Sequence, residues 1–566
     1  MSTARRRSAG APAGRGGARV VRLLGALVAT AALGACAAIP TSGAVREGDG
    51  TVSESRDVDV LAEGPRAGAT PQQIVEGFQL AGAAGFVGEF STAREYLTGA
   101  ALQSWEPLAE VLVYDDPVIP ASTQAGTVIA TIPLTARVDA DGRFTEAPRD
   151  AQRALTYELV RNRSGEWRIA DAPDGLVLSE SVFDKQFRAT SLYFLSADGT
   201  FLVPETRWFP SQSHNLQTWV ARALLAGPSP WLRDAVTTAV PEGVQLQADT
   251  VVVDDSGIAT VPLDMGTTVL KGDTASLYAQ LDATLRQVPG VREVKVTAGS
   301  VPIVDTRSVQ RGGLPDGPVE MIQDDRLVTL GEDGLGPVEG VAPLPVGARS
   351  PARDEDGTVR VMLDPAGTLV TVPLEDSPSQ VLLDGPRLVA PSVDRLGWVW
   401  TARPGEGVIA VKQGLDPVVV PAEWLDGRTV VALRMARDAT RLAVVSRGSD
   451  GVSVDVAAVV RDAQGTPQNI GEPVRAGAVL QDASDVVWLD ESVLGVVGSS
   501  DSSVLVHKVP VAGRTTTEAE VPDLAGLAGG RVVYVATTDG TLHRLVGSTW
   551  AAVTHVEGVR DPAYPG

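Results

Sequence analysis

The sequence predicts a multidomain protein in which two α+β domains precede an all-β propeller. The chain has 566 residues, more than the roughly 250 to 300 at which a single hydrophobic core stops growing. Between residues 70 and 305, apolar spacing typical of helices alternates with the period-two spacing of strands, so both elements are expected there. From residue 306 onward, short strands and turns recur at intervals of about 40 to 50 residues, as in propeller blades.

Residues 1–35 have the layout of a secretory leader. Six arginines precede an apolar run, Leu23 to Leu33, and small residues follow it. This order is typical of a signal peptide. The run is shorter than the roughly 20 residues that cross a bilayer. We therefore predict cleavage between Ala35 and Cys36.

Leu33-Gly34-Ala35-Cys36 contains the one cysteine of the chain and resembles the bacterial lipobox. The resemblance implies that Cys36 carries a lipid with acyl chains such as palmitate, and that the protein is anchored at the outer face of the cytoplasmic membrane. Two alternatives are an incidental cysteine in a plain signal peptide and a buried free thiol. A single cysteine excludes an intramolecular disulfide and argues against thiolate metal sites.

The composition is acidic. The leader holds no acidic residue, so its removal lowers the net charge from −22 to about −28. Nucleic acid would be repelled by this charge, and we expect it not to be a partner. The four histidines, His214, His507, His543 and His555, are widely separated and have no paired acid nearby. We find no catalytic, metal-binding or cofactor motif and predict that the protein is not an enzyme.

Residues 36–69 are rich in Gly, Ser, Asp, Glu and Pro and predict a flexible tether. The domain at 70–186 should begin with a helix capped by Thr70 and opened by Pro71, followed by two short helices ending near Trp105. Alternating strands are then expected over 128–138, 155–159 and 167–169.

Helices followed by a curved antiparallel sheet ending at Gly165-Glu166-Trp167-Arg168-Ile169 resemble the cone of nuclear-transport-factor-2-like (NTF2-like) domains. In many such domains the cone holds a small-molecule pocket. Here the apolar face is more simply the core of the domain.

Residues 187–305 predict two strands joined at Asp198-Gly199, a helix ended by Gly227-Pro228, a hairpin over 251–261, a helix over 277–288 and a strand at 294–296. The fragments YF…DG…LVPETR, LLAGP, VPEG, VVVDDSGIATVPLD and LDATLRQVPGVREVKV resemble the GerMN domain of bacterial envelope proteins. The resemblance implies a small sheet with helices on one side and no catalytic residues.

Two pairs of charged residues in this region have alternative interpretations. Glu205 and Arg207 are either an ion-binding pair or, more simply, a salt bridge on one strand. Asp254 and Asp255 are either metal ligands or, more simply, part of a hairpin turn.

Residues 306–566 have room for about five or six blades. The self-similar stretches begin at Val389, Val431, Val479 and Leu524. Asp438 and Asp450-Gly451 are expected to serve chain reversal. The tail at 561–566 has no strand signal and is expected to lie extended on the propeller surface.

A lipobox, an α+β domain, a GerMN domain and a propeller in this order resemble the LpqB family of actinobacterial lipoproteins. The resemblance implies an accessory protein that binds the extracellular domain of a sensor histidine kinase (MtrB-like) and modulates MtrA-MtrB two-component signalling in cell-wall homeostasis and division. Two other functions stay open. One is a sensor of a small envelope ligand such as a wall fragment or lipid, with unknown binding residues, which needs an apolar cavity of several hundred cubic ångströms. The other is a glycan hydrolase, which needs two carboxylates about 5 to 10 Å apart in the propeller channel.

Overall fold

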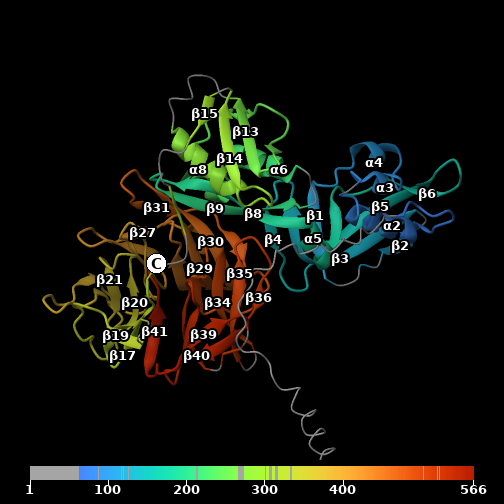
Figure 1. The fold of residues 1–566 in the computed structure, drawn as a ribbon. Coiled ribbons are helices and arrows are strands. Elements are labelled where there is room, and N and C mark those ends of the chain that lie inside the picture. Colours follow the sequence, from blue (N-terminus) through green and yellow to red (C-terminus); the bar gives the residue numbers. More distant parts are fainter. Residues whose placement is uncertain are drawn as a thin grey trace, which may run out of the picture. The chain divides into compact units, whose positions relative to one another are not determined.

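The computed structural model describes residues 63–566, except 87, 116–117, 119, 125, 212–214, 265–272, 300, 305–308, 313–316, 332–333, 501–502, 519 and 522. The predicted signal peptide, Cys36 and most of the predicted tether lie outside these residues. The described chain contains a first domain (α2 to α5), a middle domain (β8 to β16) and a propeller (β17 to β41) (Figure 1). In this part of the chain no helix is both long and apolar enough to span a membrane.

The first domain begins at the predicted helix. Helix α2 (Pro71–Ala83) begins with a capping box. The Thr70 side chain accepts a hydrogen bond from the Gln73 amide, and the Gln73 side chain accepts one from the Thr70 amide. Ile74, Val75 and Phe78 are buried against the sheet. The short helices are α3 (Ser91–Arg94), α4 (Gly99–Ser104) and α5 (Glu180–Gln186).

The sheet of the first domain has the order β6-β5-β3-β1-β7, and β2 and β4 also pair with β3. Its strands are β1 (Glu110–Tyr114), β2 (Pro120–Gln124), β3 (Thr127–Asp139), β4 (Phe144–Glu146), β5 (Gln152–Arg161), β6 (Trp167–Asp171) and β7 (Leu176–Ser179). The expected strands over 128–138, 155–159 and 167–169 are confirmed. The expectation of an antiparallel sheet ending at Ile169 is wrong, because β7 follows and pairs with β1 in parallel.

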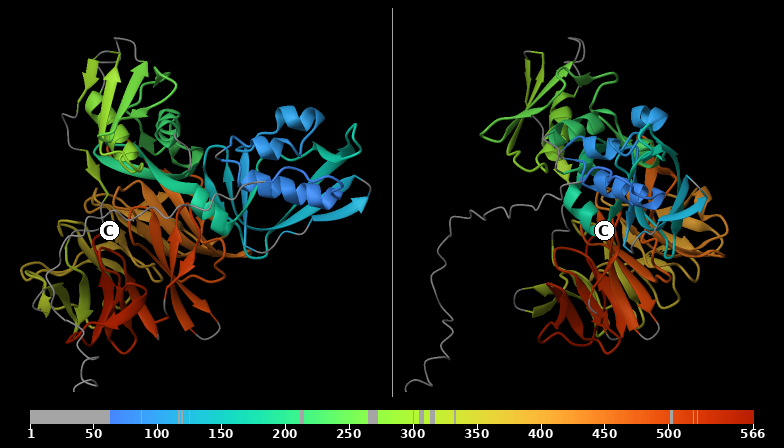
Figure 2. Two further views of the ribbon diagram at one scale, coloured as in Figure 1. Left: turned by 45° about the vertical axis from the view of Figure 1, so that its right-hand side comes forward. Right: turned by 90° about the vertical axis from the view of Figure 1, so that its right-hand side faces the viewer.

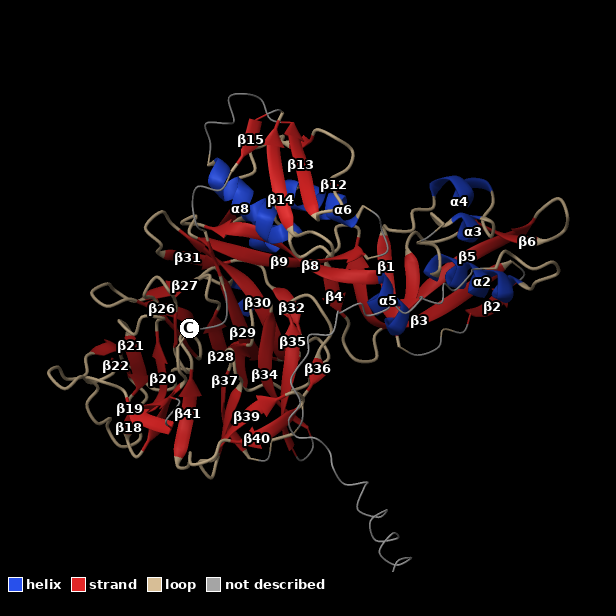
Figure 3. Ribbon diagram, viewed as in Figure 1, coloured by secondary structure: helices blue, strands red, loops and turns tan. Residues whose placement is uncertain are grey.

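The middle domain contains two sheets, β10-β8-β9-β16 and β11-β13-β14-β15, with β12 added to β13. Its elements are β8 (Phe187–Ser196), β9 (Phe201–Pro210), α6 (Leu216–Leu225), α7 (Pro230–Arg233), β10 (Val236–Thr237), β11 (Gln245–Leu246), β12 (Val252–Val253), β13 (Ile258–Asp264), α8 (Thr274–Leu285), β14 (Glu293–Ala298), β15 (Val301–Ile303) and β16 (Gln310–Arg311). Helix α8 packs on both β8 and β14, and Figure 3 shows the helices between the two sets of strands.

The expectation of one sheet with helices on one side is therefore wrong. Leu277, Leu281 and Leu285 of α8 form the predicted apolar face. Gln280 and Thr284 form a second buried face, where Gln280 donates to the Tyr193 carbonyl and Thr284 accepts from the Tyr193 amide. These polar residues satisfy the backbone of β8 and allow α8 to contact a second sheet.

The described residues of the propeller form six sheets, each counted as one blade. The first two blades are β17 (Glu320–Gln323), β18 (Arg326–Gly331) and β19 (Gly334–Pro337) with β41 (Val559–Ala563), and then β20 (Arg349–Arg353), β21 (Arg360–Leu363), β22 (Leu369–Thr371) and β23 (Val381–Leu383). The third and fourth blades are β24 (Ser392–Val393), β25 (Val399–Arg403), β26 (Gly407–Val411) and β27 (Val418–Val420), and then β28 (Thr429–Met435), β29 (Arg441–Gly448), β30 (Gly451–Arg461) and β31 (Pro467–Ile470), with β32 (Val474–Ala476). The fifth and sixth blades are β33 (Asp485–Trp488), β34 (Val493–Ser500), β35 (Ser503–Pro510) and β36 (Thr516–Thr517), and then β37 (Leu524–Ala528), β38 (Tyr534–Thr537), β39 (Leu542–Val546) and β40 (Thr549–Ala552).

The last strand closes the propeller. β41 pairs with β17, so the first blade contains both ends of the region (Figures 1 and 2). The expectation that residues 561–566 lie on the propeller surface without a strand is wrong, because β41 includes Asp561 and Pro562. Val479 to Asp482, expected to resemble strand-forming stretches of other blades, forms a turn, and the strand begins at Asp485.

Candidate functional site

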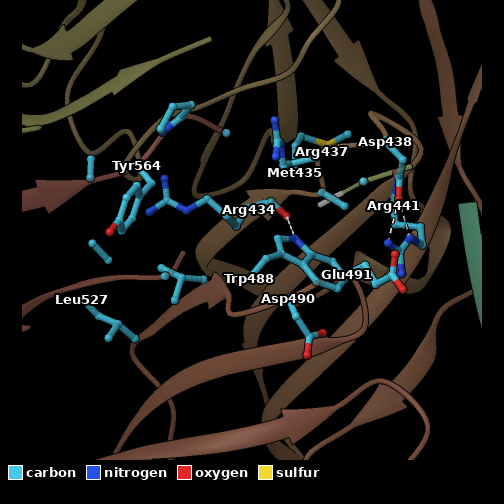
Figure 4. Close-up of a pocket in the computed structure, with 18 of the residues that line it drawn as sticks. Arg434, Met435, Arg437, Asp438, Arg441, Trp488, Asp490, Glu491, Leu527 and Tyr564 are labelled. Carbon is cyan, nitrogen blue, oxygen red and sulfur yellow. Dashed lines mark hydrogen bonds and ion pairs between the residues drawn. The ribbon is translucent and has the colours of Figure 1, made fainter. Parts of the chain in front are cut away.

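A cavity of about 60 Å³ lies at one mouth of the propeller channel (Figure 4). The turns after β28 and β33 and the ends of β37 and β41 surround it, and Pro204 and Gly312 border it from the middle domain. The side chains of Met435, Trp488, Leu527 and Tyr564 make its walls largely apolar. It is too small for an oligosaccharide, since ligand pockets of that kind enclose several hundred cubic ångströms.

One wall of the cavity is a buried ion pair on an indole ring. The Arg441 Nε donates to Asp438 Oδ2 at 2.8 Å, and both side chains are almost fully buried. The Arg441 guanidinium lies 5.0 Å from the centre of the Trp488 ring, a cation–π contact. Asp438 also accepts from the amides of Thr440 and Arg441, so the predicted role in chain reversal is confirmed.

The middle domain is tied to this mouth by charged contacts. The Arg311 Nη2 donates to Glu491 Oε1 at 2.7 Å, and the Tyr193 hydroxyl also donates to Glu491. Burial raises the pKa of Tyr193, and Glu491 raises it further. Tyr193 is therefore a neutral donor, and Glu491 is engaged by two partners.

A second contact between the same domains joins Asp198, in the turn between β8 and β9, to Arg395. Two hydrogen bonds of 2.9 Å connect the carboxylate and the guanidinium. Burial alone would raise the pKa of Asp198, but hydrogen bonds from Arg395 and Ser196 outweigh burial and hold the pKa below its usual value. The aspartate is charged and the contact persists at neutral pH.

Arg434 is the one arginine at this mouth for which the structure gives no carboxylate partner among the described residues. Its Nη1 donates to the Pro391 carbonyl at 3.1 Å, and its buried Nε has no hydrogen-bond partner in the described chain. The guanidinium extends toward Tyr564 in Figure 4. Burial lowers the pKa of Arg434, and Asp485, acting beyond salt-bridge distance, partly offsets this.

Two further titratable groups affect the charge near the cavity, Asp485 and the lining residue Tyr564. Enclosure by protein raises the pKa of Asp485, and the charge of Arg434 offsets only part of the rise. Burial raises the pKa of Tyr564 to about 12, so its hydroxyl is neutral at physiological pH. The mouth of the channel therefore combines apolar and aromatic walls with one guanidinium, that of Arg434, which has no salt bridge among the described residues.

The residues singled out in the sequence are distributed elsewhere. Ala35, Cys36 and His214 lie outside the described residues. Glu205 and Arg207 form a buried salt bridge of 3.0 Å and share Ser229 as a partner, which agrees with the simpler interpretation. Asp254 accepts from the amides of Ser256 and Ile258 in the predicted hairpin turn.

No group of three or more His, Cys, Asp or Glu residues able to hold a metal ion occurs in the described chain. The three described histidines lie apart, on β35, on β39 and in the loop before β41. His507 bonds to Thr517, with 3.0 Å between Nδ1 and Oγ1. The structure does not bring these histidines together into one site.

A larger cavity of about 380 Å³ lies between the first and middle domains. Leu108, Val111, Phe187, Trp208 and Trp219 give it apolar walls, and charged side chains border it, namely Asp139, Asp141, Arg207 and Arg222. Arg207 is already paired with Glu205. The size and lining meet the condition stated above for a pocket that could hold an envelope ligand.

Sequence reasoning did not single out Arg434, Trp488 or Tyr564. Arg434 lies in the self-similar stretch that begins at Val431. The signal was a cation between Leu433 and Met435, both buried, in the strand that lines the channel. A charged residue inside an apolar strand is expensive unless it has a function or a partner.

Comparison with protein families matches three models along the chain. Residues 64–184 match "Lipoprotein LpqB, N-terminal domain". Residues 191–304 match a model described as "Sporulation and spore germination", which corresponds to the GerMN resemblance. Residues 325–565 match "Lipoprotein LpqB beta-propeller domain". The order of the three models agrees with the domain order predicted from the sequence.

Two solved structures are similar to part of the chain. A chain of the nidogen/laminin complex is 11% identical, with a TM-score of 0.34, and covers 44% of this chain and 97% of its own. TolB from Acinetobacter baumannii is 13% identical, with a TM-score of 0.29, and covers 44% of this chain and 67% of its own.

Curated relatives extend over most of the chain. Lipoprotein LpqB of Thermobifida fusca is 27% identical, over 84% of this chain and 86% of its own. Lipoprotein LpqB of Streptomyces coelicolor is 31% identical, and the alignment covers 98% of this chain and 100% of that relative. With three family models in the same order, this similarity shows that the chain belongs to the LpqB lipoprotein family.

Proposed function

We propose that the protein is a lipoprotein anchored through Cys36 at the outer face of the cytoplasmic membrane. There it binds the extracellular domain of a sensor histidine kinase (MtrB-like) and modulates MtrA-MtrB signalling. The leader and the names of the relatives support the anchor. The relatives reported above are named as lipoproteins and not as enzymes, which agrees with a binding role.

The observation that carries the binding role is an exposed apolar surface on two neighbouring blades. Val381 on β23, Leu415 before β27 and Val419 on β27 are 60%, 56% and 56% exposed. A hydrogen bond between Gln413 and Gln380 links the two blades beside these residues. Exposed apolar residues on outer strands are typical of surfaces that contact another protein.

The proposed mechanism is a shift between kinase conformations. A partner changes a two-state equilibrium only if it binds one state more tightly than the other. Lipid anchoring would keep the protein near the kinase in the same membrane, so that even a weak contact could be populated.

We expect the chain without residues 1–36 to bind the purified extracellular domain of the kinase. Replacing Val381 and Val419 with glutamate should weaken this binding at least about tenfold, because two charges would enter an apolar contact. Calorimetry or biolayer interferometry measures the affinity. Val546→Glu is the matched control, since Val546 is 51% exposed on another blade. Equal affinity of the double variant and the wild type would reject this surface, and absence of any binding would reject the kinase as the partner.

We expect Cys36→Ala to release the protein from the membrane fraction. The variant lacks the sulfur to which the lipid would be attached, and no described helix replaces the anchor. Cell fractionation followed by immunoblotting measures the distribution. Ala38→Ser, two residues further on, should stay in the membrane fraction. A membrane-bound Cys36→Ala protein would contradict the lipid anchor.

We also propose that the first domain has the NTF2-like cone fold and that the protein binds a small envelope ligand. The cavity of about 380 Å³ favours a ligand-sensing role as the second candidate function, and it becomes the leading one if the kinase domain does not bind. The glycan-hydrolase alternative has less support, since Asp438 and Glu491 at the channel mouth are each engaged by an arginine.

A further inference from the structure

We infer that the mouth of the propeller channel binds a small monocarboxylate, whose acid group pairs with Arg434. The site is distinct from the apolar surface on β23 and β27 and does not depend on the kinase contact.

Among the described residues, Arg434 is the arginine of this cavity that has no salt bridge. Arg441 pairs with Asp438, Arg311 with Glu491 and Arg437 with Glu355. No salt bridge of Arg434 occurs among the residues that the structure describes, and its Nε is buried without an acceptor there. A buried charge is costly unless it is paired. An anionic ligand would supply the missing partner.

The cavity selects the class of anion. One guanidinium without a salt bridge balances a single negative charge, whereas a phosphate dianion would leave a second charge facing Asp490 and Glu491, which also line the cavity. A planar carboxylate matches the two-pronged donor geometry of a guanidinium. Met435, Trp488, Leu527 and Tyr564 provide apolar contacts for a short hydrocarbon body. The volume of about 60 Å³ limits that body to a few heavy atoms.

The test uses the chain without residues 1–36 and measures binding of propionate by calorimetry or ligand-observed NMR. We expect saturable binding with a Kd of about 1 mM, and no binding of the neutral isostere propionamide. Arg434→Met should weaken propionate binding by about tenfold or more. N-acetylalanine separates two sources of the acid: tighter binding than propionate indicates the end of a peptide, and weaker binding indicates a free small acid.

The controls separate binding from folding. Arg434→Met should melt at about the same temperature as the wild type, because the half-buried guanidinium has no salt bridge to lose among the described residues. Arg326→Met, which removes an exposed arginine in another blade, should bind propionate like the wild type. The inference is overturned if Arg434→Met binds propionate as tightly as the wild type, if propionamide binds equally well, or if no saturable binding occurs up to about 20 mM.

Discussion

Replacing Asp394 with alanine is expected to destabilise the propeller by about 3 to 5 kcal/mol, the cost of leaving a buried charge without its partner. Asp394 is 1% exposed, in the turn between β24 and β25. It accepts from the amides of Leu396 and Trp398 and from the indole Nε1 of Trp400 at 2.8 Å. Its second oxygen also accepts from Arg461 Nη2 at 2.5 Å.

The large expected effect arises because Asp394 joins two blades. Arg461 ends β30 in the following blade and lies 5.3 Å from the centre of the Trp400 ring. Without Asp394, the guanidinium keeps its bonds to the carbonyls of Ala439 and Gly465 but has no neutralising charge. Trp400, which is fully buried, also loses the acceptor for its indole nitrogen.

Urea unfolding at pH 7, followed by tryptophan fluorescence, measures the change in the free energy of unfolding. Asp462→Ala is the matched control, because Asp462 makes the same kind of turn with the amides of Gln464 and Thr466 at a half-buried position. It should cost about 1 kcal/mol or less. Asp394→Ala combined with Arg461→Met should be less destabilised than the sum of the single variants, since the double variant leaves no unpaired charge. A cost of Asp394→Ala equal to that of Asp462→Ala would contradict the argument.

Elements with strong local signals could be predicted from the sequence. The Thr70 cap with Pro71, the alternation over 128–138 and the hairpin at Asp254 depend on neighbouring residues only, and the structure confirms them. The propeller was predicted because its strands and turns recur at a regular interval.

The remaining features depend on contacts between distant residues. The second face of α8 is polar, and its role becomes visible only when β8 presents backbone groups to Gln280 and Thr284. Likewise, the need of Arg434 for a partner is evident only when Trp488 and Tyr564, from other blades, enclose it.

Strand β41 has no sequence signal because it contains Pro562. In the structure Asp561 also has a positive φ of 49°, which is uncommon in strands. Proline is tolerated in edge strands, where one side of the backbone needs no ladder bonds. β41 pairs on one side only, with β17, and its position at the end of the first blade's sheet supplies such an edge. Two distant parts of the chain are therefore joined by a strand that local propensity would not predict.

Deleting residues 559–566 should destabilise the propeller by more than about 4 kcal/mol, because it removes both a buried side chain and a set of ladder hydrogen bonds. Val559 is 1% exposed and packs in one cluster with Met321 and Val556. Without β41 this cluster is opened to water, and β17 becomes an unpaired edge. Thermal unfolding and limited proteolysis measure the effect.

Deleting only residues 564–566 is the control, because it keeps β41 and removes the contact between Tyr534 and Tyr564, whose ring centres are 6.3 Å apart. This deletion should lower the free energy of unfolding by only about 1 to 2 kcal/mol. Equal losses in the two deletions would mean that the tail beyond β41, and not the pairing of β41 with β17, holds the first blade to the rest of the propeller.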